Sequence, residues 1–223
     1  MTPAPTAGAR FTGFPPAALT FLAGLEADNS KAWFDAHRDV YEEAVRDPLE
    51  RLIAEAGALY GPSKVFRPNR DVRFSRDKSP YKTTAAGYAG EVGVVYAALD
   101  PRGLHVGGGL YEPARDQLAR ARAAIATDHD AGAQLAEILE TLRASGFTIT
   151  GPSLRTAPKG YPKDHPRIEL LRLQRFAALR QLPPGPDIHD PERSRAAIFG
   201  AWRALEPLTD WIRTHVGPSS DRR

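Results

Sequence analysis

The stretch 85-AAGYAGEVGVVYAALDPRGLHVGGGLY-111 decides the predicted fold. Residues 85–99 alternate with a period of two and are rich in Val and Tyr, which is typical of a β-strand. The sequence DPRG at 100–103 fits a type I turn, with proline in the second position and glycine in the fourth. Residues 104–111 are then expected to return antiparallel, so that the whole stretch forms a β-hairpin.

Helical patterns lie on both sides of this hairpin. Apolar residues recur at spacings of three and four in segments that begin near residues 16, 31, 47, 113, 130, 164 and 191. The segment after Asp164 is expected to be a helix bearing Ile168, Leu171 and Phe176, and the last helix is expected to kink or break at Pro207. Residues 65–75 are expected to form a strand interrupted by Pro68, and residues 147–150 a short strand.

These elements predict an α+β protein. Its core is an antiparallel β-sheet that contains the hairpin of about 85–111, flanked by N-terminal, central and C-terminal helices. We expect a flexible tail over residues 1–10, a single domain over 11–216 and a second flexible tail over 217–223, because both ends are rich in small and polar residues.

The composition is that of an ordinary globular protein, with 42% hydrophobic and 26% charged residues. The chain has no cysteine, which removes disulfides, thiolate metal sites and cysteine nucleophiles. No apolar run approaches the roughly 20 residues that span a bilayer, and the N-terminus lacks the pattern of a secretory signal. We therefore expect a cytoplasmic protein without a membrane partner.

Several well-known functional motifs are absent. The sequence has no P-loop, no GxSxG elbow and no HExxH helix. The glycines at 107–109 do not form a dinucleotide fingerprint, and we read them as a bulge or a close backbone crossing rather than as an anion-binding turn. The six histidines are scattered without metal-ligand spacing, so no metal site is predicted.

The stretch 67-RPNRDVRFSRDKSPYKT-83 stands out by its charge. Its cations are Arg67, Arg70, Arg73, Arg76, Lys78 and Lys82, and its acids are Asp71 and Asp77. Its net charge of +4 exceeds the +3 of the whole chain. Arginine, which prevails over lysine here, has a planar fork that suits bidentate binding of phosphate or carboxylate.

Two interpretations of this stretch remain open. If 71–75 is a strand, Arg70 points with Val72 and Phe74 toward a cleft or the interior, where it needs Asp77 or a ligand as its partner. The stretch then either binds an anion or forms a structural ion-pair network. A second basic stretch over 155–180 carries a net charge of +5, which favours the anion site if the two stretches meet.

The basic stretch also carries a resemblance. Arg67, Arg70, Asp71, Arg73, Phe74, Asp77, Lys78 and Tyr81, followed by Lys82 and Thr83, match the RxxRDxRFxxDKxxYKT motif of a widespread family of bacterial and fungal proteins. The N-terminal third, GGGLYEP and APKGYPKDHPRIELLRLQ are similar to that family as well, although Ser30 stands where a second Asn is usual. The family is of unknown function, so the resemblance identifies neither a reaction nor a cofactor.

We therefore carry three functional hypotheses. The first is a binder or enzyme of a phosphorylated or carboxylated small molecule, and its residues fall into two groups. The anion would be held by Arg67, Arg70, Arg73 and Lys82. The catalytic candidates are Asp71 as general base, Lys78 or Tyr81 as acid or orienting group, and His105 as a further acid–base group.

The second hypothesis is a nucleic-acid-binding protein, because aromatic residues lie among the cations of both basic stretches. The third is a non-enzymatic module whose basic face docks an acidic protein. A concave pocket at the basic stretch favours the first hypothesis over the third.

Overall fold

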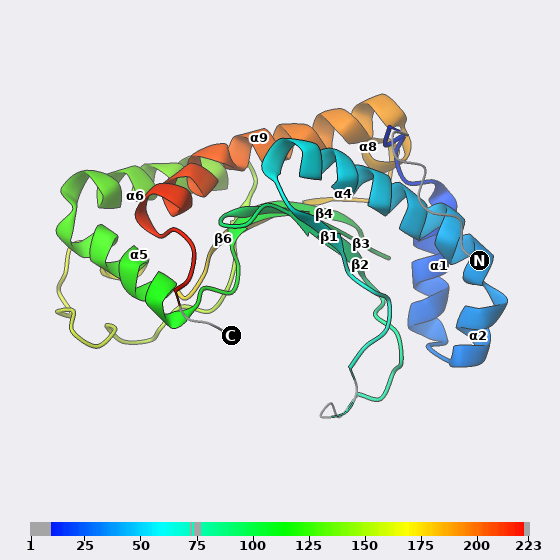
Figure 1. The fold of residues 1–223 in the computed structure, drawn as a ribbon, viewed down its shortest axis with the longest axis horizontal. Helices are drawn as coiled ribbons and strands as arrows, with labels where there is room; N and C mark the ends of the chain where they lie inside the picture. Colours follow the sequence, from blue (N-terminus) through cyan, green and yellow to red (C-terminus); the bar gives the residue numbers. More distant parts are fainter. Residues whose placement is uncertain (1–9, 72, 74–76, 221–223) are drawn as a thin grey trace. The chain divides into compact units, whose positions relative to one another are not determined.

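The structure is a computed structural model that describes residues 10–71, 73 and 77–220 (Figure 1). The helical elements are α1 (Pro16–Ala27), α2 (Lys31–Ala36), α3 (Arg38–Val40), η1 (Tyr41–Arg46), α4 (Asp47–Tyr60), α5 (Arg115–Thr127), α6 (His129–Ala144), α7 (Ile168–Leu171), α8 (Pro186–His189) and α9 (Pro191–His215). The strands are β1 (Ser63–Val65), β2 (Ala85–Ala89), β3 (Val94–Asp100), β4 (Gly103–Leu110), β5 (Thr148–Ile149) and β6 (Phe176–Leu182).

The strands of the described residues form one six-stranded antiparallel sheet in the order β1-β2-β3-β4-β6-β5, which confirms the predicted α+β class. The predicted hairpin is β3–β4, and Asp100 holds its turn by accepting a hydrogen bond from the Arg102 amide at 2.7 Å. The prediction of a single strand over 85–99 is wrong. Gly90 and Gly93 have φ of 114° and 71°, and the chain turns there to separate β2 from β3.

The predicted helix through Phe176 is also wrong, because α7 ends at Leu171 and Phe176 begins β6. Strand β6 lies so close to β4 that a side chain at Gly107 or Gly109 would collide with the carbonyls of Ala178 or Phe176. The glycine run is therefore a close backbone crossing, as its composition suggested. Sheet pairing here overrides the helix preference of the Ala- and Leu-rich segment.

The chain divides into two compact units, and each is assembled from separate stretches of sequence. Unit 1 comprises Met1–Gly90, Tyr96–Val106 and Gln181–Gly200, and unit 2 comprises Glu91–Val95, Gly107–Arg180 and Ala201–Arg223. The single domain expected from the sequence stays a prediction. No helix among the described residues is both long and apolar enough to span a membrane.

Aromatic packing defines the core of unit 1 near α1 and α2. Phe21 of α1 contacts Phe34 and Tyr41 at ring-centroid distances of 5.9 and 5.6 Å. Phe34 is in turn 5.2 Å from Tyr41, and all three side chains are buried. Helix α2 begins at Lys31, near the predicted start, and Ser30 caps it, because the Ser30 hydroxyl accepts a hydrogen bond from the Trp33 amide at 3.1 Å.

In unit 2, α5 packs against α6, and the second half of α9 contacts α6. The buried Trp211 indole of α9 donates a 2.9 Å hydrogen bond to the carbonyl of Ala131 in α6. Pro207 does not break α9, which continues to His215. The sequence predicted a kink or a break at Pro207, and the continuity of α9 excludes the break.

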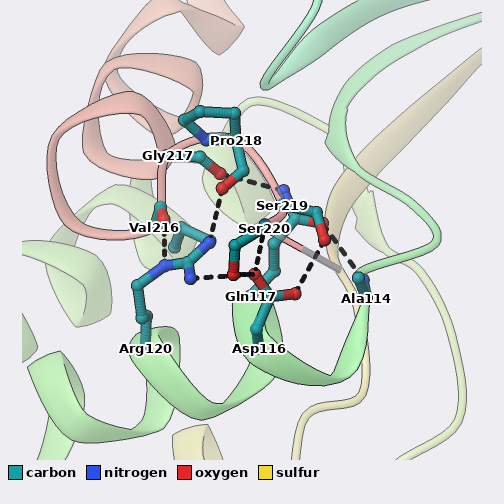
Figure 2. Close-up of polar contacts among 9 residues, drawn as sticks. All are labelled: Ala114, Asp116, Gln117, Arg120, Val216, Gly217, Pro218, Ser219 and Ser220. Carbon is teal, nitrogen blue, oxygen red and sulfur yellow. Dashed lines mark hydrogen bonds and ion pairs between the residues drawn. The ribbon is translucent and has the colours of Figure 1, made fainter. Parts of the chain in front are cut away.

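The segment that follows α9 is hydrogen-bonded to the first turns of α5 (Figure 2). Asp116 accepts hydrogen bonds from the Ser219 hydroxyl at 2.8 Å and from the Ser220 amide at 2.8 Å. Arg120 donates to the carbonyls of Val216 and Pro218, and Gln117 donates to that of Gly217. The described part of the predicted C-terminal tail, Gly217–Ser220, is therefore held on α5. The flexibility of the tail stays a prediction.

Candidate anion-binding site

The basic stretch 67–83, here called the basic arm, connects β1 to β2 within unit 1. The two strands pair with Ser63 opposite Ala89 and Val65 opposite Gly87, and the pairing continues into the arm. The Arg70 amide donates to the Pro80 carbonyl at 2.9 Å, and the Lys82 amide donates to the Pro68 carbonyl at 2.8 Å. In Figure 1 the described part of the arm extends from the ends of β1 and β2.

The predicted strand over 65–75 is only partly described. Strand β1 ends at Val65, and a single antiparallel bridge joins Asn69 to Tyr81. Val72 and residues 74–76 lie outside the described residues. The arrangement of side chains predicted for 71–75 therefore stays a prediction.

Tyr81 anchors the basic arm to the aromatic core. Its ring stacks on Phe34 with centroids 4.0 Å apart and an interplanar angle of 11°, and it is 6% exposed. Its backbone amide donates to Asn29 Oδ1 at 3.0 Å, and its carbonyl accepts from Asn29 Nδ2 at 3.2 Å. The structure thus places Tyr81, a catalytic candidate, in an anchoring position.

Two of the predicted anion-binding arginines form ion pairs within the arm. Arg70 pairs with Asp77, which is one of the two partners expected for it. Arg73 forms a bidentate pair with Asp71, with distances of 2.9 and 2.6 Å, and its side chain remains 77% exposed. Exposed pairs of this kind contribute little stability, so they orient the guanidinium groups more than they hold the fold.

These contacts also set the protonation of the two carboxylates. Hydrogen bonds from the side chain and backbone of Arg73 hold the pKa of Asp71 below its usual range. Hydrogen bonds from Ser79, and then from Arg70, lower the pKa of Asp77 to about 2. A general base works best with a pKa near the operating pH, so Asp71 is a weak base while Arg73 remains paired to it.

Arg67 and Lys82 are arranged differently. Among the described residues, the Arg67 guanidinium forms no ion pair or hydrogen bond, and the Lys82 ammonium contacts no carboxylate. Lys82 Nζ instead donates to the Arg67 carbonyl at 3.2 Å and lies 5.5 Å from the centre of the Phe66 ring. Burial lowers the pKa of Lys82, and the positive charges of Arg67 and Arg70 lower it further. Positive charge therefore gathers at the base of the arm.

The remaining candidates lie apart from this cluster of cations or at the exposed end of the arm. Lys78 is exposed on the arm next to Asp77. His105 lies on β4, where its Nε2 is 3.1 Å from Asp100 Oδ2. The Asp100 carboxylate is buried and also pairs with Arg102 at 2.9 Å, so the polar contact of His105 is with the residues of the β3–β4 turn. Among the described residues no group of three potential ligands is placed to hold a metal ion.

The second basic stretch, 155–180, belongs to unit 2, whereas the basic arm belongs to unit 1. Several of its cations serve local contacts. Arg167 donates to the carbonyls of Ile125 and His129 at 3.1 and 2.7 Å, and Arg175 lies 3.9 Å from the centre of the Tyr111 ring. These contacts account for part of the charge of this stretch without a ligand.

Sequence reasoning missed two features of the site. Asn29 was not singled out as a site residue, because nothing in its local sequence indicates a contact with Tyr81. Phe66 and Tyr88 were not singled out, yet their rings lie 5.7 Å apart beside the base of the arm. The alternation of 85–89 would have placed Tyr88 on one face of its strand, but not beside Phe66.

Fold and site together define an α+β protein with an antiparallel sheet and an aromatic-anchored basic arm. Residues 17–211 match the model of a family described as conserved hypothetical protein (DUF2461), so the chain belongs to that family. This confirms the family-level resemblance seen in the sequence. No curated protein matches the chain.

Proposed function

We propose that the basic arm binds the anionic group of a small phosphorylated or carboxylated molecule. One observation carries the proposal. Arg67 and Lys82 lie together at the base of the arm, and among the described residues neither has a carboxylate partner. The positive charges of Arg67, Arg70 and Lys82 repel one another, the Asp71 carboxylate near Arg67 offsets only part of this repulsion, and a bound anion would relieve the rest.

The backbone of the arm supports this role. The ladder between 68–70 and 80–82 fixes the base of the arm, and Tyr81 fixes the ladder to the aromatic core. Because this backbone is already fixed, ligand binding has to order the side chains of Arg67 and Lys82 but not the chain that carries them. Arg70 and Arg73, oriented by Asp77 and Asp71, lie further along the arm and would contact a larger ligand.

The arrangement of the site bears differently on the predicted catalytic residues than on the predicted anion-binding residues. Asp71, Lys78, Tyr81 and His105 stay predicted catalytic residues. The arrangement favours anion binding over acid–base chemistry, because Asp71 is ion-paired and Tyr81 is stacked. We therefore propose a binding function first, with any reaction dependent on a substrate that displaces Arg73 from Asp71.

Titration calorimetry at low ionic strength tests the proposal with inorganic phosphate and with citrate as probes. We expect saturable binding that weakens with added salt. Arg67→Gln and Lys82→Met should each weaken binding about tenfold or more, since each removes a charge-assisted contact. Arg203→Gln, at an exposed arginine of α9, is the matched control and should bind as the parent protein does.

Two results would count against the proposal. One is the absence of saturable binding for either anion. The other is equal binding by Arg67→Gln, Lys82→Met and the parent protein. Thermal unfolding of each variant separates a lost ligand contact from a lost fold: if the variants unfold, the structural-network interpretation of the arm holds instead.

A further inference from the structure

The β1–β2 pair has one face packed on α4 and another that points away from it. A side chain at Gly87 would meet Ile53 of α4 at 2.7 Å, so the residues that point with Gly87 face this helix. Successive strand residues point to opposite faces. Ala86 and Tyr88 therefore point away from α4.

The register brings Lys64 of β1 and Phe66, the residue after β1, onto this same face. Lys64 lies directly opposite Tyr88, and the Phe66 amide donates to the Ala86 carbonyl at 2.8 Å. Phe66 and Tyr88 form a tilted ring pair with centroids 5.7 Å apart, here called the aromatic pair. Both residues are half-buried, so part of each remains accessible to solvent.

Cations stand on both sides of the aromatic pair. Lys64 is exposed beside Tyr88, and Lys82 Nζ lies 5.5 Å from the centre of the Phe66 ring. Lys82 also belongs to the proposed anion site, because it donates to the Arg67 carbonyl. The aromatic pair and the anion site are therefore adjacent and share one residue.

We propose that the site recognises a phosphate ester that carries a flat aromatic ring, as a nucleoside monophosphate does. This inference rests on the proposed function, since Arg67 and Lys82 would hold the phosphate. The ring of the ligand would lie against the aromatic pair, where stacking on protein rings is favourable for any base. Charge complementarity selects the ester group, and the aromatic pair selects the ring.

A single nucleotide fits this face better than a nucleic-acid chain. Proteins that bind single strands use a groove that follows the backbone and several rings that stack successive bases. On the described face of β1–β2 there is one aromatic pair, flanked by one lysine on each side. That arrangement matches one ring and one phosphate.

The test compares four probes by titration calorimetry: adenosine monophosphate, ribose 5-phosphate, inorganic phosphate and adenosine. We expect adenosine monophosphate to bind about tenfold more tightly than ribose 5-phosphate, which lacks the ring. Tyr88→Ala should remove this advantage and leave ribose 5-phosphate binding unchanged. Tyr111→Ala is the matched control, because Tyr111 is an exposed tyrosine beside a cation in unit 2.

Each other outcome points to a definite conclusion. Equal affinity for the two esters, or an advantage that survives Tyr88→Ala and Phe66→Leu, overturns the ring inference and leaves the anion site standing. Tight binding of a short oligothymidylate without any advantage for the mononucleotide overturns it in favour of nucleic acid. If no phosphate-bearing probe binds, the proposed function itself fails.

Discussion

The side chain of Asn29 hydrogen-bonds to both backbone polar groups of Tyr81. Its Oδ1 accepts from the Tyr81 amide at 3.0 Å, and its Nδ2 donates to the Tyr81 carbonyl at 3.2 Å. A carboxamide thus pairs with Tyr81 as a neighbouring strand would. The contact joins the basic arm to the connection between α1 and α2.

Asn29→Ala should destabilise the protein by about 1 to 3 kcal/mol, because it leaves two partly buried backbone groups of Tyr81 without their partner. Urea-induced unfolding measures this change. Asn69→Ala is the matched control, since the Asn69 side chain forms no hydrogen bond among the described residues. Equal stability of the two variants would show that the Asn29 contact contributes nothing.

Lys82 provides a direct measure of the positive charge at the base of the arm. Burial lowers its pKa first, and the charges of Arg67 and Arg70 add to that effect. Arg67→Gln should therefore raise the pKa of Lys82 back toward 10.5, and saturating phosphate should raise it as well. Arg73→Gln should leave it unchanged. NMR titration of the Lys82 side chain distinguishes these cases, and an unchanged pKa in Arg67→Gln contradicts the prediction.

Tyr41 makes stability depend on pH in the alkaline range. Burial raises its pKa from 10.0 to about 12. Between these values the unfolded chain releases the phenol proton and the folded chain retains it, so stability is full below about pH 10 and falls as pH rises toward 12. The loss should reach about 2 to 3 kcal/mol.

Tyr41→Phe should remove this part of the alkaline loss and remain close to the parent protein at neutral pH, because the hydroxyl has no hydrogen bond among the described residues. Urea unfolding at neutral pH and near pH 11 provides the comparison. Tyr111→Phe, at an exposed tyrosine, should retain the loss. An identical pH dependence in all three proteins would refute the assignment.

Asp116 fixes the segment after α9 on α5 (Figure 2). The Ser220 amide, with smaller contributions from Ser219 and Arg120, holds the pKa of Asp116 far below its usual range. This stabilisation is therefore present above the ordinary carboxyl pKa and is lost only in strong acid. Asp116→Asn should speed amide hydrogen exchange at Ser220 near neutral pH, whereas Asp130→Asn, on the exposed first turn of α6, should not.

The parts of the fold that depend on neighbouring residues were predictable. The DPRG turn and the Ser30 cap are set within four residues, and both appear in the structure. Strand β6 was not predictable in the same way. Its Ala- and Leu-rich sequence favours a helix, and only the side-chain-free backbone of Gly107 and Gly109 lets it pair with β4.

The candidate site likewise combines local contacts, which were predictable, with contacts between distant residues, which were not. The arginines and aspartates of the basic arm lie close in sequence, so the partner of Arg70 was foreseen as Asp77. Tyr81 is separated from Asn29 and Phe34 by about 50 residues of sequence, so no local sequence pattern could predict these contacts. The aromatic pair depends on strand register, which a sequence alone leaves unset.

Each of the two compact units draws on three separate stretches of the chain, so neither unit corresponds to one contiguous segment of the gene. Unit 1 takes one stretch from before the sequence of unit 2 and two stretches from within it. No pair of cuts excises either unit intact, and recombination of contiguous gene segments cannot transplant the basic arm with all of its surroundings. The arm and its anchors Asn29 and Phe34 all lie within residues 17–211, the part of the chain that matches the family model.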